Sequence, residues 1–267
     1  MQLSIGKAWE ETAAFLAREG RLVAPVALAL FAFPSTLFNW AYPPGSTTNG
    51  SGTAMLVLFV ILLALMIGQM TIILLAIGWH GSIGEAIGKV ARRVPSLLGA
   101  SLIVFGPLLV LFSVGLAALL VAAGIDNPAA VTPEQIVKVP GVLWLTVLVF
   151  LMVCFLSVRL FPMSAVAANE QIGPIGLLKR SWSLSSGRFG RLLMALALLV
   201  VAALALSAAV STVVGSLVAL LIGEPRPFNL SALIIALAGG IVAALLSSVG
   251  AAMIGRIYVQ LSAPPAA

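Results

Sequence analysis

The stretch Met55–Trp79, MLVLFVILLALMIGQMTIILLAIGW, contains no charged residue and decides the fold class. A second uncharged run, from 192 to 223, is longer still. Each run exceeds the roughly 20 residues that a helix needs to cross about 30 Å of hydrocarbon. Because lipid offers the backbone no hydrogen-bond partners, such runs are expected to be helical. The sequence therefore predicts an all-α membrane protein.

The composition of the whole chain agrees with this prediction. Of the 267 residues, 61% are hydrophobic and only 8% are charged, whereas a soluble domain has about 25% charged residues. The formal net charge is +6, and the basic residues flank the apolar runs. Charges placed in this way set topology and attract anionic lipid head groups. We therefore expect no nucleic-acid partner.

Six membrane spans are expected, and they form one integral membrane domain over residues 1–267. The spans lie near 22–41, 54–79, 97–123, 142–166, 191–221 and 232–259. Loops near 42–52, 124–140 and 223–229 hold only two basic residues, Lys138 and Arg226. The opposite side carries basic clusters before the first span and in the loops after the second and fourth spans. By the positive-inside rule that side is cytoplasmic, and an even number of spans places both termini there.

An Ile-Gly pair recurs at residues 5–6, 83–84 and 175–176, and each pair opens a basic amphipathic segment that leads into a span. Ser82 and Glu85 fit a capping box at the start of the second segment. The pattern predicts three parallel repeats, near 4–79, 82–166 and 174–259. Each repeat would consist of one interfacial helix and two spans. The alternative is that any short cytoplasmic loop needs a basic amphipathic linker.

The segment from 159 to 193, RLFPMSAVAANEQIGPIGLLKRSWSLSSGRFGRLL, has a distinctive pattern. Arg159, Pro162 and Glu170 precede Gly-Pro-Ile at 173–175 and Lys-Arg-Ser-Trp at 179–182. This pattern resembles the membrane domain of bacterial glycerophosphodiester phosphodiesterases, in a stand-alone form that lacks the catalytic barrel. The resemblance covers about 35 residues and implies a bacterial inner-membrane protein. It carries no chemistry to this chain.

Residues that would support catalysis are sparse. The chain has one histidine, His80, one cysteine, Cys154, and eight scattered acidic residues. Metal-dependent hydrolysis needs clustered His and carboxylate ligands, and no nucleophile or phosphate-loop motif is present. We therefore expect a protein that is not an enzyme, with no catalytic residue, no metal and no cofactor.

Arg159 and Arg256 are the main candidate site residues because they lie within predicted spans. A charge at that depth is costly and marks a functional candidate. The alternative is that both side chains reach the cytoplasmic head groups by snorkelling or make structural pairs. Gln69, at a comparable depth, is a third candidate for binding an anion or a lipid. The cytoplasmic cluster adds four more candidates: Lys179, Arg180, Arg188 and Arg191.

These features favour a non-catalytic membrane protein that organises membrane lipid or a partner protein. The expected partners are anionic head groups on the cytoplasmic side, together with a possible membrane-protein partner. The alternative function is a small transporter or permease for an anionic or lipidic solute. It would be based on the repeats and on Arg159 and Arg256.

Overall fold

The computed structural model describes residues 4–43, 52–125 and 133–262, and every regular element in these ranges is a helix. Within them, six helical segments are long and apolar enough to cross a membrane. They are Ile5–Ala41, Gly52–Ile77, Val94–Ala122, Val142–Asn169, Phe189–Leu221 and Leu230–Ser262. The prediction of an all-α, multi-pass membrane protein is therefore confirmed. The loop segments 44–51 and 126–132, and the ends of the proposed 1–267 domain, lie outside the described residues.

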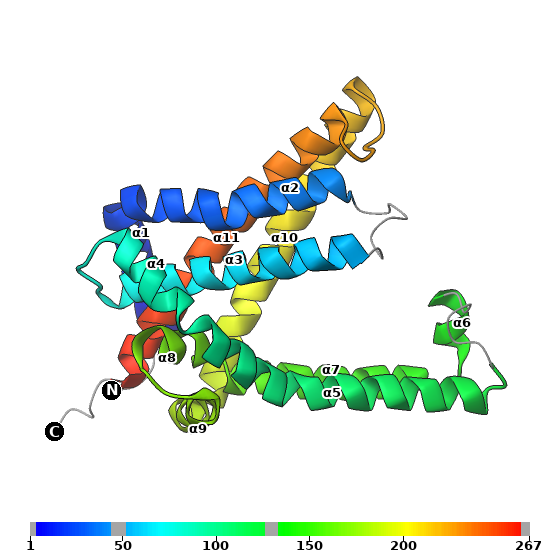
Figure 1. Cartoon of the computed structure of the whole chain (residues 1–267), viewed down its shortest axis with the longest axis horizontal. Coiled ribbons are helices and arrows are strands. Elements are labelled where there is room, and N and C mark those ends of the chain that lie inside the picture. The colour runs from blue at the N-terminus through cyan, green and yellow to red at the C-terminus, as the bar shows by residue number, and fades with distance from the viewer. Residues whose placement is uncertain (1–3, 44–51, 126–132, 263–267) are drawn as a thin grey trace.

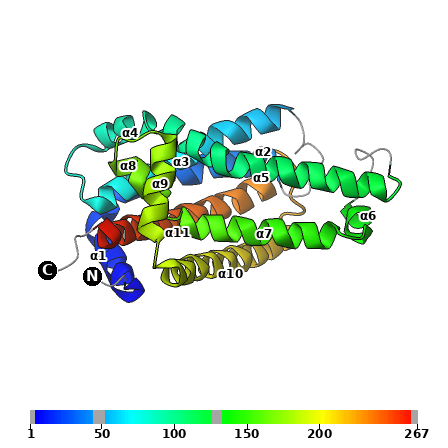
Figure 2. The ribbon, with the colours of Figure 1, turned by 90° about the horizontal axis from the view of Figure 1, so that it is seen from below.

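The first span begins earlier than predicted. It runs without a break through α1 (Ile5–Ala27), the π-helical turn η1 (Leu28–Ala32) and α2 (Phe33–Ala41). The π turn lies between Pro25 and Pro34, each of which lacks a backbone N–H, and the Phe33 amide donates to the Leu28 carbonyl across it. Figure 2 shows the start of α1 crossing the end of the bundle, while α2 runs along it.

The fourth span departs from the continuous helix predicted for 142–166. α7 (Val142–Arg159) ends at Arg159, and α8 (Met163–Asn169) starts after a three-residue break. Pro162 accounts for the break, because its ring would clash with the carbonyl four residues earlier and it cannot donate a helical hydrogen bond.

The remaining spans are α3 (Gly52–Ile77), α5 (Val94–Ala122), α10 (Phe189–Leu221) and α11 (Leu230–Ser262), and the shorter helices are α4 (Ile83–Ala91), α6 (Pro133–Lys138) and α9 (Pro174–Ser185). The predicted capping box of α4 is confirmed. The Ser82 hydroxyl accepts from the Glu85 amide at 3.2 Å, and Glu85 Oε2 accepts from the Ser82 amide at 3.3 Å. These bonds satisfy amides that a helix start leaves unpaired.

Two faces of α9 have different surroundings. Leu177, Ser181 and Leu184 are buried against the protein. The apolar stripe that includes Ile175 and Trp182 points outward, with 62% and 43% of these two residues exposed. An outward apolar stripe on a short helix that crosses the end of the bundle fits a position at the lipid interface.

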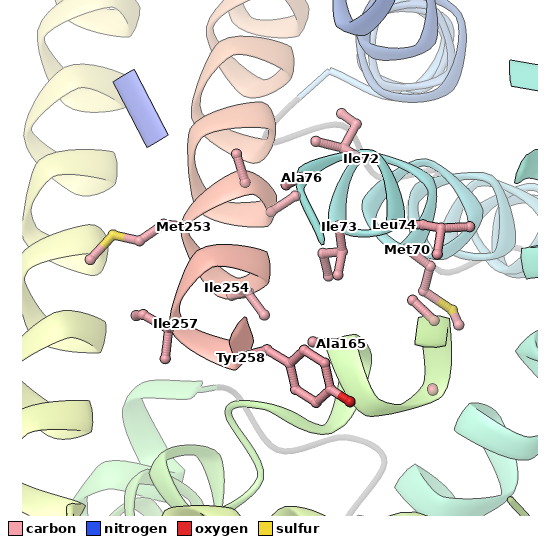
Figure 3. Packing of buried hydrophobic residues seen from close by; sticks show 14 of the residues in the cluster. Met70, Ile72, Ile73, Leu74, Ala76, Ala165, Met253, Ile254, Ile257 and Tyr258 are labelled. Atoms are coloured by element: carbon pink, nitrogen blue, oxygen red, sulfur yellow. The ribbon is translucent and has the colours of Figure 1, made fainter. Parts of the chain in front are cut away.

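The hydrophobic core lies at one end of the molecule. The second half of α3 and the last part of α11 contribute many of its buried side chains, and α8 packs against them. Figure 3 shows Ile73 and Ala76 of α3 facing Ile254 and Tyr258 of α11. Toward the opposite end the helices diverge, so that α2 and α3 separate from α5 and α7 (Figure 1).

Glycines bring α11 close to its neighbours. A Cβ on Gly240 would overlap the Thr36 hydroxyl and approach the Ala32 carbonyl oxygen at 2.8 Å. A Cβ on Gly255 would lie 3.0 Å from Ala76 Cβ and 3.1 Å from the Ile73 carbonyl oxygen. Small residues allow this approach between membrane helices. They explain why α11 is packed against both α2 and α3.

Candidate anion-binding end

Nearly all of the basic residues gather at the end of the bundle that contains the core. In Figure 1, α4, α8, α9 and the beginning of α1 lie at this end, whereas α6 lies at the other. The Ser4 amide donates to Gln260 Oε1 at 3.3 Å, so the first and last described helices meet here. We call it the basic end. Of the 14 Lys and Arg residues, only Lys138 and Arg226 lie in the connections at the opposite end.

Arg159 is held in an aromatic cage. Its guanidinium carbon lies 4.9 Å from the ring centroid of Trp182 in α9, 5.5 Å from that of Phe155 in α7 and 5.6 Å from that of Phe189 in α10. Its Nε is buried and has no hydrogen-bond partner. Cation–π attraction of this kind stabilises a desolvated arginine. Arg159 therefore joins the ends of α7, α9 and α10, which is the structural pairing considered as an alternative from the sequence.

Arg256 occupies a different place. Its guanidinium lies 5.5 Å from the Phe15 ring of α1, and its buried Nε makes no hydrogen bond. The side chain lines a cavity of about 340 Å³ together with Arg18, Trp79 and His80. A buried, unsatisfied guanidinium nitrogen beside a cavity favours an anionic or hydrogen-bond-accepting occupant.

The structure does not assemble Arg159, Arg256 and Gln69 into one site. Arg159 belongs to the α7–α9–α10 cage and Arg256 to the α1–α11 cavity. Gln69, half-buried in α3, lies in neither set. The similar depth of the three residues in the sequence could not reveal this, because depth along a span says nothing about the direction in which a side chain points.

The four basic candidates of the α9–α10 region lie at the basic end, and they differ in how exposed they are and in their partners. Lys179 and Arg191 are exposed, and Arg188 is half-buried where α10 begins. Arg180 donates from Nε to Glu170 Oε1 at 3.1 Å. The same carboxylate oxygen accepts from the Tyr258 hydroxyl at 2.8 Å. Arg180 is therefore a link between α9 and α11 as well as a surface charge.

A second basic cavity involves residues that the sequence did not single out as a site. It has a volume of about 580 Å³ and lies between α4, the start of α5 and the loop from α8 to α9. Lys89, Arg92 and Arg93 line it. The Lys-x-x-Arg-Arg spacing was visible in the sequence. Only the fold shows that the loop at 170–173 forms another wall of the same cavity.

The basic residues of this cavity differ in their partners. Arg93 Nη1 donates to the carbonyls of Ala168 at 2.6 Å and Ala167 at 3.2 Å, which lie in the last turn of α8. Lys89 Nζ lies 4.5 Å from the Trp79 ring centroid. Burial, and then the nearby Arg93 charge, lower the pKa of Lys89. Burial also lowers the pKa of Arg93. An anion in the cavity would oppose both effects, because it stabilises the charged forms.

No group of three or more His, Cys, Asp or Glu side chains suited to a metal ion occurs within residues 4–43, 52–125 and 133–262. The arrangement at the basic end is suited to binding anions. It offers guanidinium and ammonium groups around two cavities.

The fold and this one-sided charge define a multi-pass helical membrane protein with a basic end that contains several short helices. Sequence comparison identifies the family: the chain belongs to the family described as a domain of unknown function, DUF7847, which matches residues 3–261. Comparisons with curated proteins and with solved structures returned no match.

Proposed function

We propose that the protein is a non-catalytic membrane protein that binds anionic phospholipid head groups at its basic end and thereby organises lipid, or a partner protein, in the membrane. The observation that carries this proposal is the placement of α4, α9 and the beginning of α1 at one end, with nearly all of the basic side chains. Each basic residue near an anionic surface contributes about 1 kcal/mol of attraction.

The proposed membrane is the bacterial inner membrane, with both termini and the basic end in the cytoplasm. The charge asymmetry supports this orientation through the positive-inside rule. The resemblance to the membrane domain of glycerophosphodiester phosphodiesterases stays a prediction, since the family match bears on it in neither direction.

We also propose that the chain is built from three parallel repeats near 4–79, 82–166 and 174–259. In support, the beginning of α1, α4 and α9 all lie at the basic end, and each leads into two spans. The second and third copies are separate short helices, and the first is continuous with its span. A repeat unit of this kind would distribute basic interfacial helices around the bundle.

The environment of Arg159 favours this proposal over the transporter alternative. The centroids of three aromatic rings lie within 5.6 Å of its guanidinium carbon, so the side chain has a structural role that needs no solute anion. The same contacts make Arg159 a poor choice for a binding test, because its substitution would disturb the packing of three helices.

The test is lipid enrichment around the purified protein in nanodiscs that contain equal amounts of phosphatidylglycerol and phosphatidylcholine. Two double variants are compared. One combines Arg21→Gln and Lys179→Gln, both exposed at the basic end, and the other combines Lys138→Gln and Arg226→Gln at the opposite end. Each double variant removes two positive charges. Arg180 is left intact, since its loss would also break the Glu170 ion pair.

We expect phosphatidylglycerol enrichment in the wild-type protein, a decline as salt is raised because ions screen exposed charges, and a loss only in the basic-end variant. Equal effects of the two variants, or enrichment that ignores salt, would show that electrostatic binding at the basic end is wrong. Salt-dependent transport of an anionic solute by the wild-type protein in liposomes would instead support the permease.

A further inference from the structure

A basic cavity and an apolar groove follow one another along α5, and we propose that one anionic phospholipid fills both. Ser96 lines the basic cavity described above, and Leu98 and Gly99, on the next turn, line the groove. The phosphate would lie by Lys89 and Arg92, and an acyl chain would lie in the groove. This inference rests on the proposed function and gives it a site.

The charged side chains that line the basic cavity carry a net charge of +1, because Lys89, Arg92 and Arg93 outnumber Glu85 and Glu170. Glu170 is also paired with Arg180, which lies outside the lining. Arg93 is committed to the α8 carbonyls. Arg92 is exposed, and its guanidinium has no described hydrogen bond or ion pair, while its backbone amide donates to the Val90 carbonyl. Together with Lys89 it presents two cations to an incoming phosphate.

The groove has a volume of about 650 Å³ and is lined by carbon. Side chains of α5, α7 and one residue of α3 form it, among them Phe59, Leu102, Phe105, Phe112 and Val153. It exists because α3 and α5 diverge away from the basic end (Figure 1). In a bilayer the occupant of such a groove is an acyl chain, since a polar solute there would lose its hydrogen bonds to water.

The groove makes it possible to distinguish a free phosphate from the phosphate of a phospholipid. A free phosphate or a glycerol phosphate would use the basic cavity alone. A phospholipid would use both, and its affinity would depend on residues of the groove that no phosphate touches. Gly106 provides a way to test this dependence, because a Cβ there would meet only Leu102 of its own helix, at 3.5 Å or more. A side chain at this position of the groove lining can therefore begin without a clash at its Cβ.

The experiment is native mass spectrometry of the detergent-solubilised protein with added phosphatidylglycerol, or with phosphatidylcholine of the same chains. The variants are Arg92→Gln alone, Lys89→Gln with Arg92→Gln, and Gly106→Leu. The control is Lys138→Gln with Arg226→Gln. Thermal unfolding checks that each variant is folded. The single Arg92→Gln variant keeps the Lys89–Trp79 contact, so it stays informative if the double variant is unstable.

We expect one tightly retained phosphatidylglycerol on the wild-type protein, with affinity about tenfold lower in each cavity and groove variant and unchanged in the control. Loss with Arg92→Gln but not with Gly106→Leu, together with competition by soluble glycerol phosphate, would overturn the lipid in favour of a free phosphate. Unchanged affinity in all variants would overturn the site and leave the proposed function standing. Equal retention of phosphatidylcholine would overturn the proposed function itself.

Discussion

α10 and α11 have the same length and nearly the same hydropathy, yet only one of them is packed into the protein. Each has 33 residues, with mean hydropathy over the spanning window of 2.7 for α10 and 2.4 for α11. In those windows, 6% of α10 and 33% of α11 is buried inside the protein. Hydrophobicity therefore shows that both helices enter the membrane. It does not show which one faces lipid.

Both helices carry a stripe of small residues, but only the stripe of α11 is covered by neighbouring helices. In α11 the stripe Gly240, Ala244, Ser248 and Ala252 is buried throughout. In α10 the stripe Ser207, Ser211 and Gly215 lines a groove of about 670 Å³ that separates it from part of α11. Small-residue spacing thus permits close packing, but the neighbouring helix must also arrive at the right angle.

The largest expected effect is that of Gly240→Ala. The added Cβ would overlap the Thr36 hydroxyl and crowd the Ala32 carbonyl oxygen, so α2 and α11 must separate. We expect a loss of about 3 kcal/mol in the free energy of unfolding, measured by titration with denaturing detergent. Gly239→Ala, at the preceding residue, places a Cβ that meets nothing within 4 Å and serves as the control. Helix propensity favours alanine at both positions, so a loss confined to Gly240→Ala reports the close approach, and equal losses in both variants would contradict it.

Arg159→Ala should loosen α10 at its beginning. The cage of Phe155, Trp182 and Phe189 would lose its cation, at a cost of about 2 kcal/mol for a desolvated pair. Hydrogen exchange should rise in the first turns of α10 and at the end of α7, with the α2–α11 contact unaffected. Arg226→Ala, at the far end, is the charge control. Unchanged exchange in α10 would show that the cage does not hold this helix.

Tyr258→Phe should weaken the attachment of α11 to the interfacial helices. It removes the hydroxyl that donates to Glu170 and accepts from Asn169 Nδ2 at 3.3 Å, for a loss of about 1 kcal/mol. Tyr42→Phe is the matched control, because these are the two tyrosines of the chain. Proteolysis in the 170–173 loop would report the change. A similar sensitivity in both variants would contradict a specific role of the Tyr258 hydroxyl.

Gly215→Ala in α10 should have the smallest effect. A Cβ at this position would meet nothing within 4 Å, so we expect a change within about 0.5 kcal/mol. Unfolding in detergent measures it alongside Gly240→Ala. A loss comparable to that of Gly240→Ala would mean that α10 packs against a neighbour through this stripe in the membrane.

Local features of the chain were predictable where a residue acts on its own backbone or on its nearest turn. The six spans follow from apolar length, and the Ser82–Glu85 cap follows from spacing alone. The interruption at 160–162 follows from Pro162, whereas the apolar pattern alone predicts a continuous span over 142–166. The cap and the interruption depend on hydrogen bonds or steric contacts within a few residues, which one-dimensional patterns record.

The sequence by itself determined a six-span helical membrane protein with its positive charge concentrated on one side, because hydrocarbon demands long apolar helices and the placement of Lys and Arg sets topology. Only the tertiary structure decided that Arg159 lies in an aromatic cage, that Arg256 and Gln69 are apart from it, and that Lys89, Arg92 and Arg93 share a cavity with a loop some 80 residues away. Spacing along a helix gives the face of a side chain. The partner of that face depends on how the helices cross, and this is set by contacts between residues far apart in the chain.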